Sequence, residues 1–87
     1  MQKTLSEHLL FRIDTTCNMA RFYCLSIEPS LFGDAALVRQ WGRIGTRGRA
    51  MVDLYRSEAE ARQAFERLLA AKQKRGYRLD AGRHHAA

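Results

Sequence analysis

The 87-residue sequence contains few of the residues that support disulfide, metal or membrane chemistry. Cys17 and Cys24 are the two cysteines, too few for a disulfide framework or a zinc site. No apolar run approaches the roughly 20 residues of a membrane-spanning helix, and the first residues lack the apolar core of a signal peptide. We therefore predict free thiols, a cytoplasmic location and no membrane partner.

The sequence also lacks a catalytic constellation. His8, His84 and His85 lie near the two ends, and no Ser–His–Asp set or activated cysteine can be assembled around them. The adjacent His84 and His85 supply two metal ligands on a polar tail, too few for a specific site. The glycine-rich segment 42–48 lacks the lysine followed by serine or threonine of a P-loop. We predict a non-catalytic protein with no cofactor and no metal.

Acidic residues are the minority among the charged ones. Nine Asp and Glu against fifteen Lys and Arg give a net charge of +6, which favours an anionic partner such as nucleic acid. A chain of this length forms one domain with a modest core, which favours a binding module over an enzyme with a deep cleft.

Alternating apolar residues predict four strands, at 9–14, 20–28, 36–45 and 49–56. In the first of these, Leu9, Phe11 and Ile13 form the apolar face of a half-buried strand. A turn is expected at the segment TTCN, and the segment GTRG is expected to close a hairpin between the third and fourth strands. Cys24 falls in an apolar strand and is expected to behave as a small buried hydrophobe.

The spacing becomes helical after Tyr55. Ser57 and Glu60 form a capping box, and Gly76 follows a basic last turn, as at the end of an α-helix. The apolar stripe of this helix consists of Ala61, Ala64, Phe65, Leu68 and Leu69.

These elements predict an α+β fold. We expect an antiparallel sheet of four or slightly more strands with one C-terminal α-helix packed on one face. The domain is expected over residues 9–79, with a flexible N-terminus at 1–8 and a disordered tail at 80–87. One sheet face or edge is left open for a partner.

The segment RQWGRIGTRGRA, residues 39–50, surrounds the single tryptophan with arginines. Strand alternation places Arg39, Trp41 and Arg43 on one face, and Gly42 leaves bare backbone that permits a close approach. In a structural interpretation, Trp41 anchors the core and both arginines stack on it. In a functional interpretation, the ring stacks on a base or ribose and the arginines bind phosphate. The two interpretations are compatible if one edge of the Trp41 ring is buried and the other is accessible.

The charge of this hairpin favours the functional interpretation. Arg47 lies in the predicted turn and Arg49 directly after it, so the hairpin carries four arginines with no acid between Asp34 and Asp53. Solvated surfaces usually mix charges of both signs.

The residues resemble a WGR domain, the module named for the tripeptide found here at 41–43. The resemblance also takes in NMARFY at 18–23, WGRIG at 41–45 and Gly48, followed by an alanine-rich helix with Phe65, Lys72 and then Tyr77. It runs over residues 9–79, and the chain is similar to short bacterial proteins made of little but this module.

The resemblance implies contact with DNA near a break, as in poly(ADP-ribose) polymerases. It implies that Trp41 packs on the terminal nucleotide and that Arg43 contacts phosphate or a partner domain. Asn18 and Tyr23 would support the site from the neighbouring strand. An ADP-ribosyltransferase domain does not fit in 87 residues, so that activity is not implied.

We thus predict a nucleic-acid-binding module for DNA ends or nicks, associated with the nucleoid. The alternative is a protein-interaction module with Trp41 and Arg43 as its hot spot. RNA binding is less favoured, because no RNP-type aromatic pattern occurs. The oligomeric state is left open. The predicted site residues are Trp41, Arg43, Arg39, Arg47, Arg49, Gly42, Asn18 and Tyr23.

Overall fold

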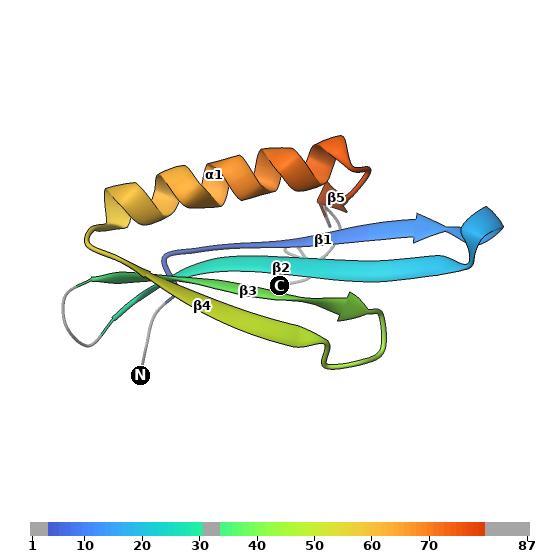
Figure 1. Cartoon of the computed structure of the whole chain (residues 1–87), viewed down its shortest axis with the longest axis horizontal. Coiled ribbons are helices and arrows are strands. Elements are labelled where there is room, and N and C mark those ends of the chain that lie inside the picture. The colour runs from blue at the N-terminus through green and yellow to red at the C-terminus, as the bar shows by residue number, and fades with distance from the viewer. Residues whose placement is uncertain (1–3, 31–33, 80–87) are drawn as a thin grey trace, which may run out of the picture.

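A computed structural model describes residues 4–30 and 34–79 of the chain. This part forms five strands, one α-helix and one short 3₁₀ turn (Figure 1). In chain order the elements are β1 (Ser6–Asp14), η1 (Thr15–Cys17), β2 (Met19–Pro29), β3 (Ala35–Arg43), β4 (Arg49–Tyr55), α1 (Glu58–Lys74) and β5 (Arg78–Leu79). The predicted tail at 80–87 lies outside the described residues.

The sheet is antiparallel throughout, in the order β4-β3-β2-β1-β5. The first four strands form a meander, and α1 then crosses one face from the β4 edge to the β1 edge, where β5 pairs with β1. The predicted α+β fold with one helix on one face is confirmed. The fifth strand follows from the turn after α1, which brings the chain back to the sheet.

The core lies between α1 and the sheet. Ala61, Ala64 and Phe65 of the predicted helical stripe are buried, and Leu68 and Leu69 pack against them. Phe65 is 2% exposed, and burying such a side chain contributes about 1.5–3 kcal/mol. The strands contribute the rest of this core cluster, namely Leu10, Tyr23, Leu25, Ile27, Ala35 and Leu37.

The prediction that Leu9, Phe11 and Ile13 form the core face of β1 is wrong. Leu10 is fully buried, whereas Ile13 is 64% exposed and Leu9 and Phe11 are half-buried. The ring of His8 lies 5.4 Å from that of Phe65, so the even-numbered residues of β1 face α1. The strand is apolar on both faces, and its hairpin register with β2 decides which face α1 covers. That strand also begins at Ser6, because residues 6–8 pair with 25–27 of β2.

Both ends of α1 are capped as the sequence predicts. The Ser57 hydroxyl accepts a hydrogen bond from the Glu60 amide at 3.2 Å. At the other end, Gly76 has a φ of +99°, and the Tyr77 amide donates to the Lys72 carbonyl at 3.0 Å. This cap reverses the chain and fixes Lys72 and Tyr77 beside the sheet.

The two cysteines differ in environment. Cys17 is exposed at the β1–β2 turn, whereas Cys24 is half-buried on the face opposite α1 and its thiol donates to a Glu7 carboxylate oxygen at 3.7 Å. Burial, followed by the charge of Glu7, raises the pKa of the Cys24 thiol to about 11.

Alkylation is therefore expected to discriminate between the two thiols. At pH 8 only about one Cys24 thiol in a thousand is ionised, so iodoacetamide should modify Cys17 at least ~100-fold faster. Peptide mass spectrometry over time measures both rates. Equal rates would contradict the environment described for Cys24, and Glu7→Gln should speed its reaction.

Candidate nucleic-acid interface

The segment that carries Trp41 forms the end of β3 and the turn into β4. Gly45 and Gly48 have φ values of +97° and +70°, which glycine adopts without strain. A Cβ on Gly48 would lie 2.0 Å from the Trp41 carbonyl oxygen, and one on Gly42 would lie 2.6 Å from the Gly48 Cα. The close approach that Gly42 permits is therefore made by Gly48 of the same hairpin. This contact fixes the backbone that holds Trp41.

Trp41 belongs to an aromatic cluster with Tyr23 and Tyr77. Tyr23 lies opposite Trp41 in the β2–β3 register, with 6.1 Å between the ring centroids. The ring centroid of Tyr77 also lies 6.1 Å from that of Tyr23. Tyr23 is buried, whereas Trp41 is half-buried against the core. The indole is thus both anchored and partly accessible.

A lysine caps this cluster. The Lys72 Nζ lies 4.4 Å from the ring centroid of Tyr23 and 5.5 Å from that of Tyr77. Burial, followed by the charges of Arg75 and Arg39, lowers the pKa of Lys72. Among the described residues, cation–π contacts are thus made by Lys72, and not by the arginines beside Trp41.

Arg39 is held by a different strand. Its guanidinium forms an ion pair with Asp53 of β4 at 3.2 Å and also contacts the Met51 sulfur. Asp53 is distant in sequence but lies on the neighbouring strand, two residue pairs from Arg39 in the β3–β4 register and on the same face. Part of the charge that we counted as free in the hairpin is therefore neutralised.

Two further arginines, which were not among the predicted site residues, lie in line with Arg43 across the sheet. In the sheet register, Arg12 of β1 pairs with Arg21 of β2, and Arg21 pairs with Arg43 of β3. We call these three residues the arginine row. Like charges directly opposite each other destabilise a sheet, and within residues 4–30 and 34–79 no ion pair neutralises them. The row lies on the face of Trp41, two residue pairs further along the strands.

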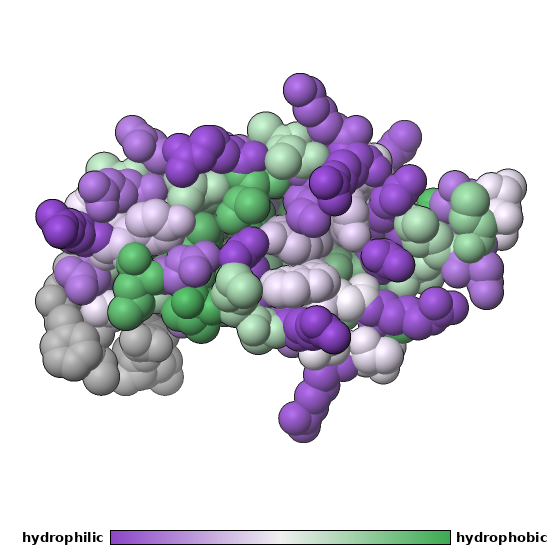
Figure 2. All heavy atoms as spheres, viewed as in Figure 1, coloured by the Kyte–Doolittle hydropathy of each residue, from purple (hydrophilic) through white to green (hydrophobic). Residues whose placement is uncertain are grey.

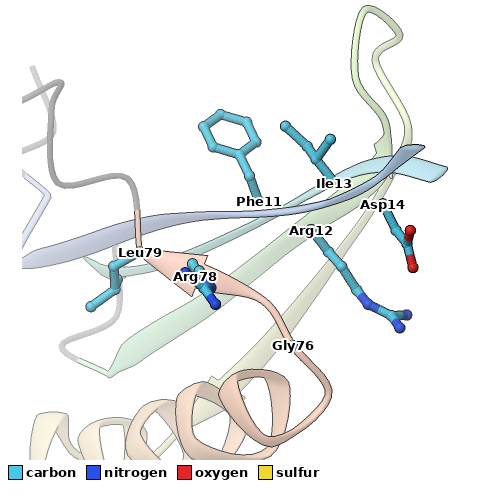
Figure 3. A pocket seen from close by; sticks show the side chains of 7 residues that line it. All are labelled: Phe11, Arg12, Ile13, Asp14, Gly76, Arg78 and Leu79. Carbon is cyan, nitrogen blue, oxygen red and sulfur yellow. The ribbon is translucent and has the colours of Figure 1, made fainter. Parts of the chain in front are cut away.

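The arginine row lies past the end of α1. The ends of β1 and β2 extend beyond the last turn of the helix (Figure 1), so α1 does not cover them. A groove of about 490 Å³ is lined by Arg12 and Asp14 of β1, by Gly76 and by β5. Figure 3 shows that Arg12 points to the helix side of β1, and a Cβ on Gly76 would lie 3.2 Å from its Nε.

The structure brings some of the predicted site residues together and separates others. Arg49 lies opposite Trp41 in the β3–β4 register, so Trp41, Tyr23, Arg43 and Arg49 share one surface. Arg47 lies in the turn, where its carbonyl accepts from Gln40 on the opposite face.

Asn18 lies at the β1–β2 turn, in the left-handed conformation with a φ of 52°. Its amide donates to the Thr15 carbonyl at 3.3 Å. Tyr23 lies five steps further along the chain, which is about 17 Å in an extended strand. In this structure Asn18 closes a hairpin and does not contact the aromatic cluster.

The arginine row could have been predicted in part from the sequence, by way of the β1–β2 hairpin. Residues equally distant from a tight turn face each other in a hairpin, and Arg12 and Arg21 are equally distant from the turn between Asp14 and Met19. Arg21 lies inside the segment already matched to the family, but its cross-strand neighbours come from register alone.

Other kinds of site are not found in the described part of the chain. No group of three or more His, Cys, Asp or Glu side chains that could hold a metal ion occurs there. No helix among the same residues is long and apolar enough to cross a membrane.

A half-buried tryptophan, a lysine-capped tyrosine pair and unpaired arginines on an antiparallel sheet define a small α+β binding module with a cationic, aromatic surface. The family model described as the WGR domain matches residues 6–83, and the chain belongs to the WGR domain family. The WGR domain is a non-catalytic module that is known to bind nucleic acid.

One curated relative extends this comparison. The uncharacterized protein y4dW of Sinorhizobium fredii is 55% identical to the chain over 67 residues. The match covers 77% of this chain and 33% of the relative, so the chain spans about one third of that protein's length. No solved structure matches the chain.

Proposed function

We propose that the chain binds DNA at ends or nicks, with Trp41 stacking on the terminal nucleotide and the arginine row contacting the adjacent phosphates. The observation that supports this is that a partly accessible indole and three unpaired guanidinium groups share one face of the sheet. Arg49, opposite Trp41, adds a fourth. Arg39 stays with Asp53 in this arrangement.

The preference for an end follows from the chemistry of stacking. Inside a continuous duplex both faces of every base are covered by neighbouring bases, so an indole finds a free base face only at a terminus, a nick or a single strand. Such stacking contributes about 1–3 kcal/mol per base. Guanidinium groups bind phosphate oxygens bidentately, and opposite residues lie about 5 Å apart, so the row spans about 10 Å.

The single tryptophan provides the direct test. The protein is titrated with nicked, blunt-ended and closed-circular DNA while the fluorescence of Trp41 is followed. The nicked and blunt-ended DNA are used with and without a 5′-phosphate. We expect quenching by DNA with ends or nicks and none by closed circles. Equal quenching by closed-circular DNA would contradict end recognition, and no response to any DNA would favour the protein-interaction alternative.

The salt dependence of binding tests the arginine row. Four phosphates contacted by Arg12, Arg21, Arg43 and Arg49 give a slope of log K against log salt of about −3.6. Arg21→Ala is expected to reduce it to about −2.7 and to weaken binding to all DNA ends alike.

Arg56→Ala is the matched control for that experiment, because it removes the same charge from the segment between β4 and α1. It lies one residue past Tyr55, which is six pairs from Trp41 in the β3–β4 register. Its slope should stay near that of the unmodified protein. Equal changes in both variants would indicate a general charge effect and not a site.

A further inference from the structure

The sheet has a second broad face that α1 does not cover, which we call the open face. Alternation and register assign the odd-numbered residues of β1 and the even-numbered residues of β2, β3 and β4 to it. Figure 3 shows Phe11 and Ile13 pointing away from the helix side of β1. Its larger apolar side chains are Leu9, Phe11, Ile13, Phe22, Val38, Val52 and Leu54.

Several of these side chains are strongly exposed. Ile13 is 64% exposed, Val52 58% and Leu54 65%. In the view of Figure 2, hydrophobic side chains reach the surface below α1 on the page, at the level of β3 and β4, between hydrophilic ones. Val38 pairs with Val52, and Leu54 follows on the same face of β4, so these three apolar side chains are neighbours. An exposed apolar patch on a small domain marks an interaction site.

The charge distribution indicates which partner fits this face. All five arginines of the four long strands, at 12, 21, 39, 43 and 49, lie on the helix side. The open face of the same strands carries two acids, Glu7 and Glu28, and no basic residue. Because the chain has a net charge of +6, two copies repel each other in most orientations. Contact through the open faces keeps the arginines of the two copies farthest apart, so this repulsion is smallest there.

We propose that the open faces of two copies pack against each other and form a twofold symmetric dimer. In such an interface the same patch serves both copies, and two sheets pack about 10 Å apart with interleaved side chains. Strands of about nine residues, four abreast, give about 600 Å² of flat sheet per copy. Together the two faces bury about 1,200 Å², the lower limit of a specific interface.

The dimer directs the two Trp41 surfaces outward on opposite sides. If the function proposed above holds, one dimer binds two DNA ends at once; this consequence rests on that proposal, but the dimer itself does not.

Sedimentation equilibrium without DNA tests the dimer. The unmodified chain is expected to show a concentration-dependent mass that approaches twice 10.0 kDa. Val52→Lys places one charge per copy in the interface and should raise the dissociation constant about 100-fold. Circular dichroism should be unchanged, because Val52 is 58% exposed and outside the core.

Met51→Lys is the matched control. Met51 neighbours Val52 in sequence, is 45% exposed and lies on the helix side of β4, so this variant should remain dimeric. The proposal is wrong if the unmodified chain is still monomeric at a concentration 100-fold above a dissociation constant of ~1 μM. It is also wrong if Val52→Lys remains dimeric, or if both variants dissociate equally. Val52→Lys should still bind DNA ends, so loss of the dimer and loss of DNA binding are separable.

Discussion

Gly48→Ala is expected to destabilise the domain by about 3 kcal/mol. The new Cβ would lie 2.0 Å from the Trp41 carbonyl oxygen and 2.7 Å from its carbon, both backbone atoms that cannot rotate away. The backbone would also be held at a φ of +70°, which side chains other than glycine rarely adopt. Urea unfolding followed by the fluorescence of Trp41 measures the change in free energy.

Gly45→Ala separates the two causes of this loss. Gly45 has a φ of +97°, but nothing lies within 4 Å of the position that its Cβ would take. The substitution therefore carries the conformational cost without the clash, and we expect a loss of about 1–2 kcal/mol. If both variants lost the same stability, the contact between Gly48 and the Trp41 backbone would not be what closes the hairpin.

Trp41→Ala is expected to lower the affinity for DNA ends by roughly 10- to 100-fold. Loss of one stacked base costs about 1–3 kcal/mol, and each 1.4 kcal/mol is a factor of ten. The salt slope should be nearly unchanged, because no charge is removed. Fluorescence anisotropy of a labelled nicked duplex measures the affinity, since the variant has lost its own fluorophore.

Trp41→Phe serves as the control, because phenylalanine keeps an aromatic face against Tyr23. It should retain most of the affinity, whereas Trp41→Leu, similar in bulk to phenylalanine but without a ring, should not. Equal affinity in the leucine and phenylalanine variants would contradict stacking. Circular dichroism of each variant shows whether the domain remains folded.

Local features of the fold could be predicted from the sequence because their causes are local. The cap at Ser57 depends on residues within one helical turn, and the reversal at Gly76 needs only an achiral residue after a helix. The hairpin at 45–48 likewise follows from two glycines at positions of positive φ. None of these depends on distant parts of the chain.

The features that were missed depend on which strands become neighbours. Arg39 is neutralised by Asp53, fourteen residues away but adjacent across the sheet. The arginine row exists because the register of two hairpins brings three strands into line. The face of β1 could not be assigned because Leu10 and Phe11 are both apolar. The register with β2 places Leu10 beside Tyr23, on the face that α1 covers.

The cap at Gly76 also gives α1 a defined length. Lys72 lies over Tyr23 because it occurs fifteen residues after the N-cap at Ser57, and Tyr77 follows through the reversal. One residue inserted before Lys72 would rotate it by about 100° and move it 1.5 Å along the axis, away from the ring. Insertions are therefore tolerated less well inside this helix than in the surface loops of the domain. In longer proteins that carry this module, added segments are expected in the loops and at the ends.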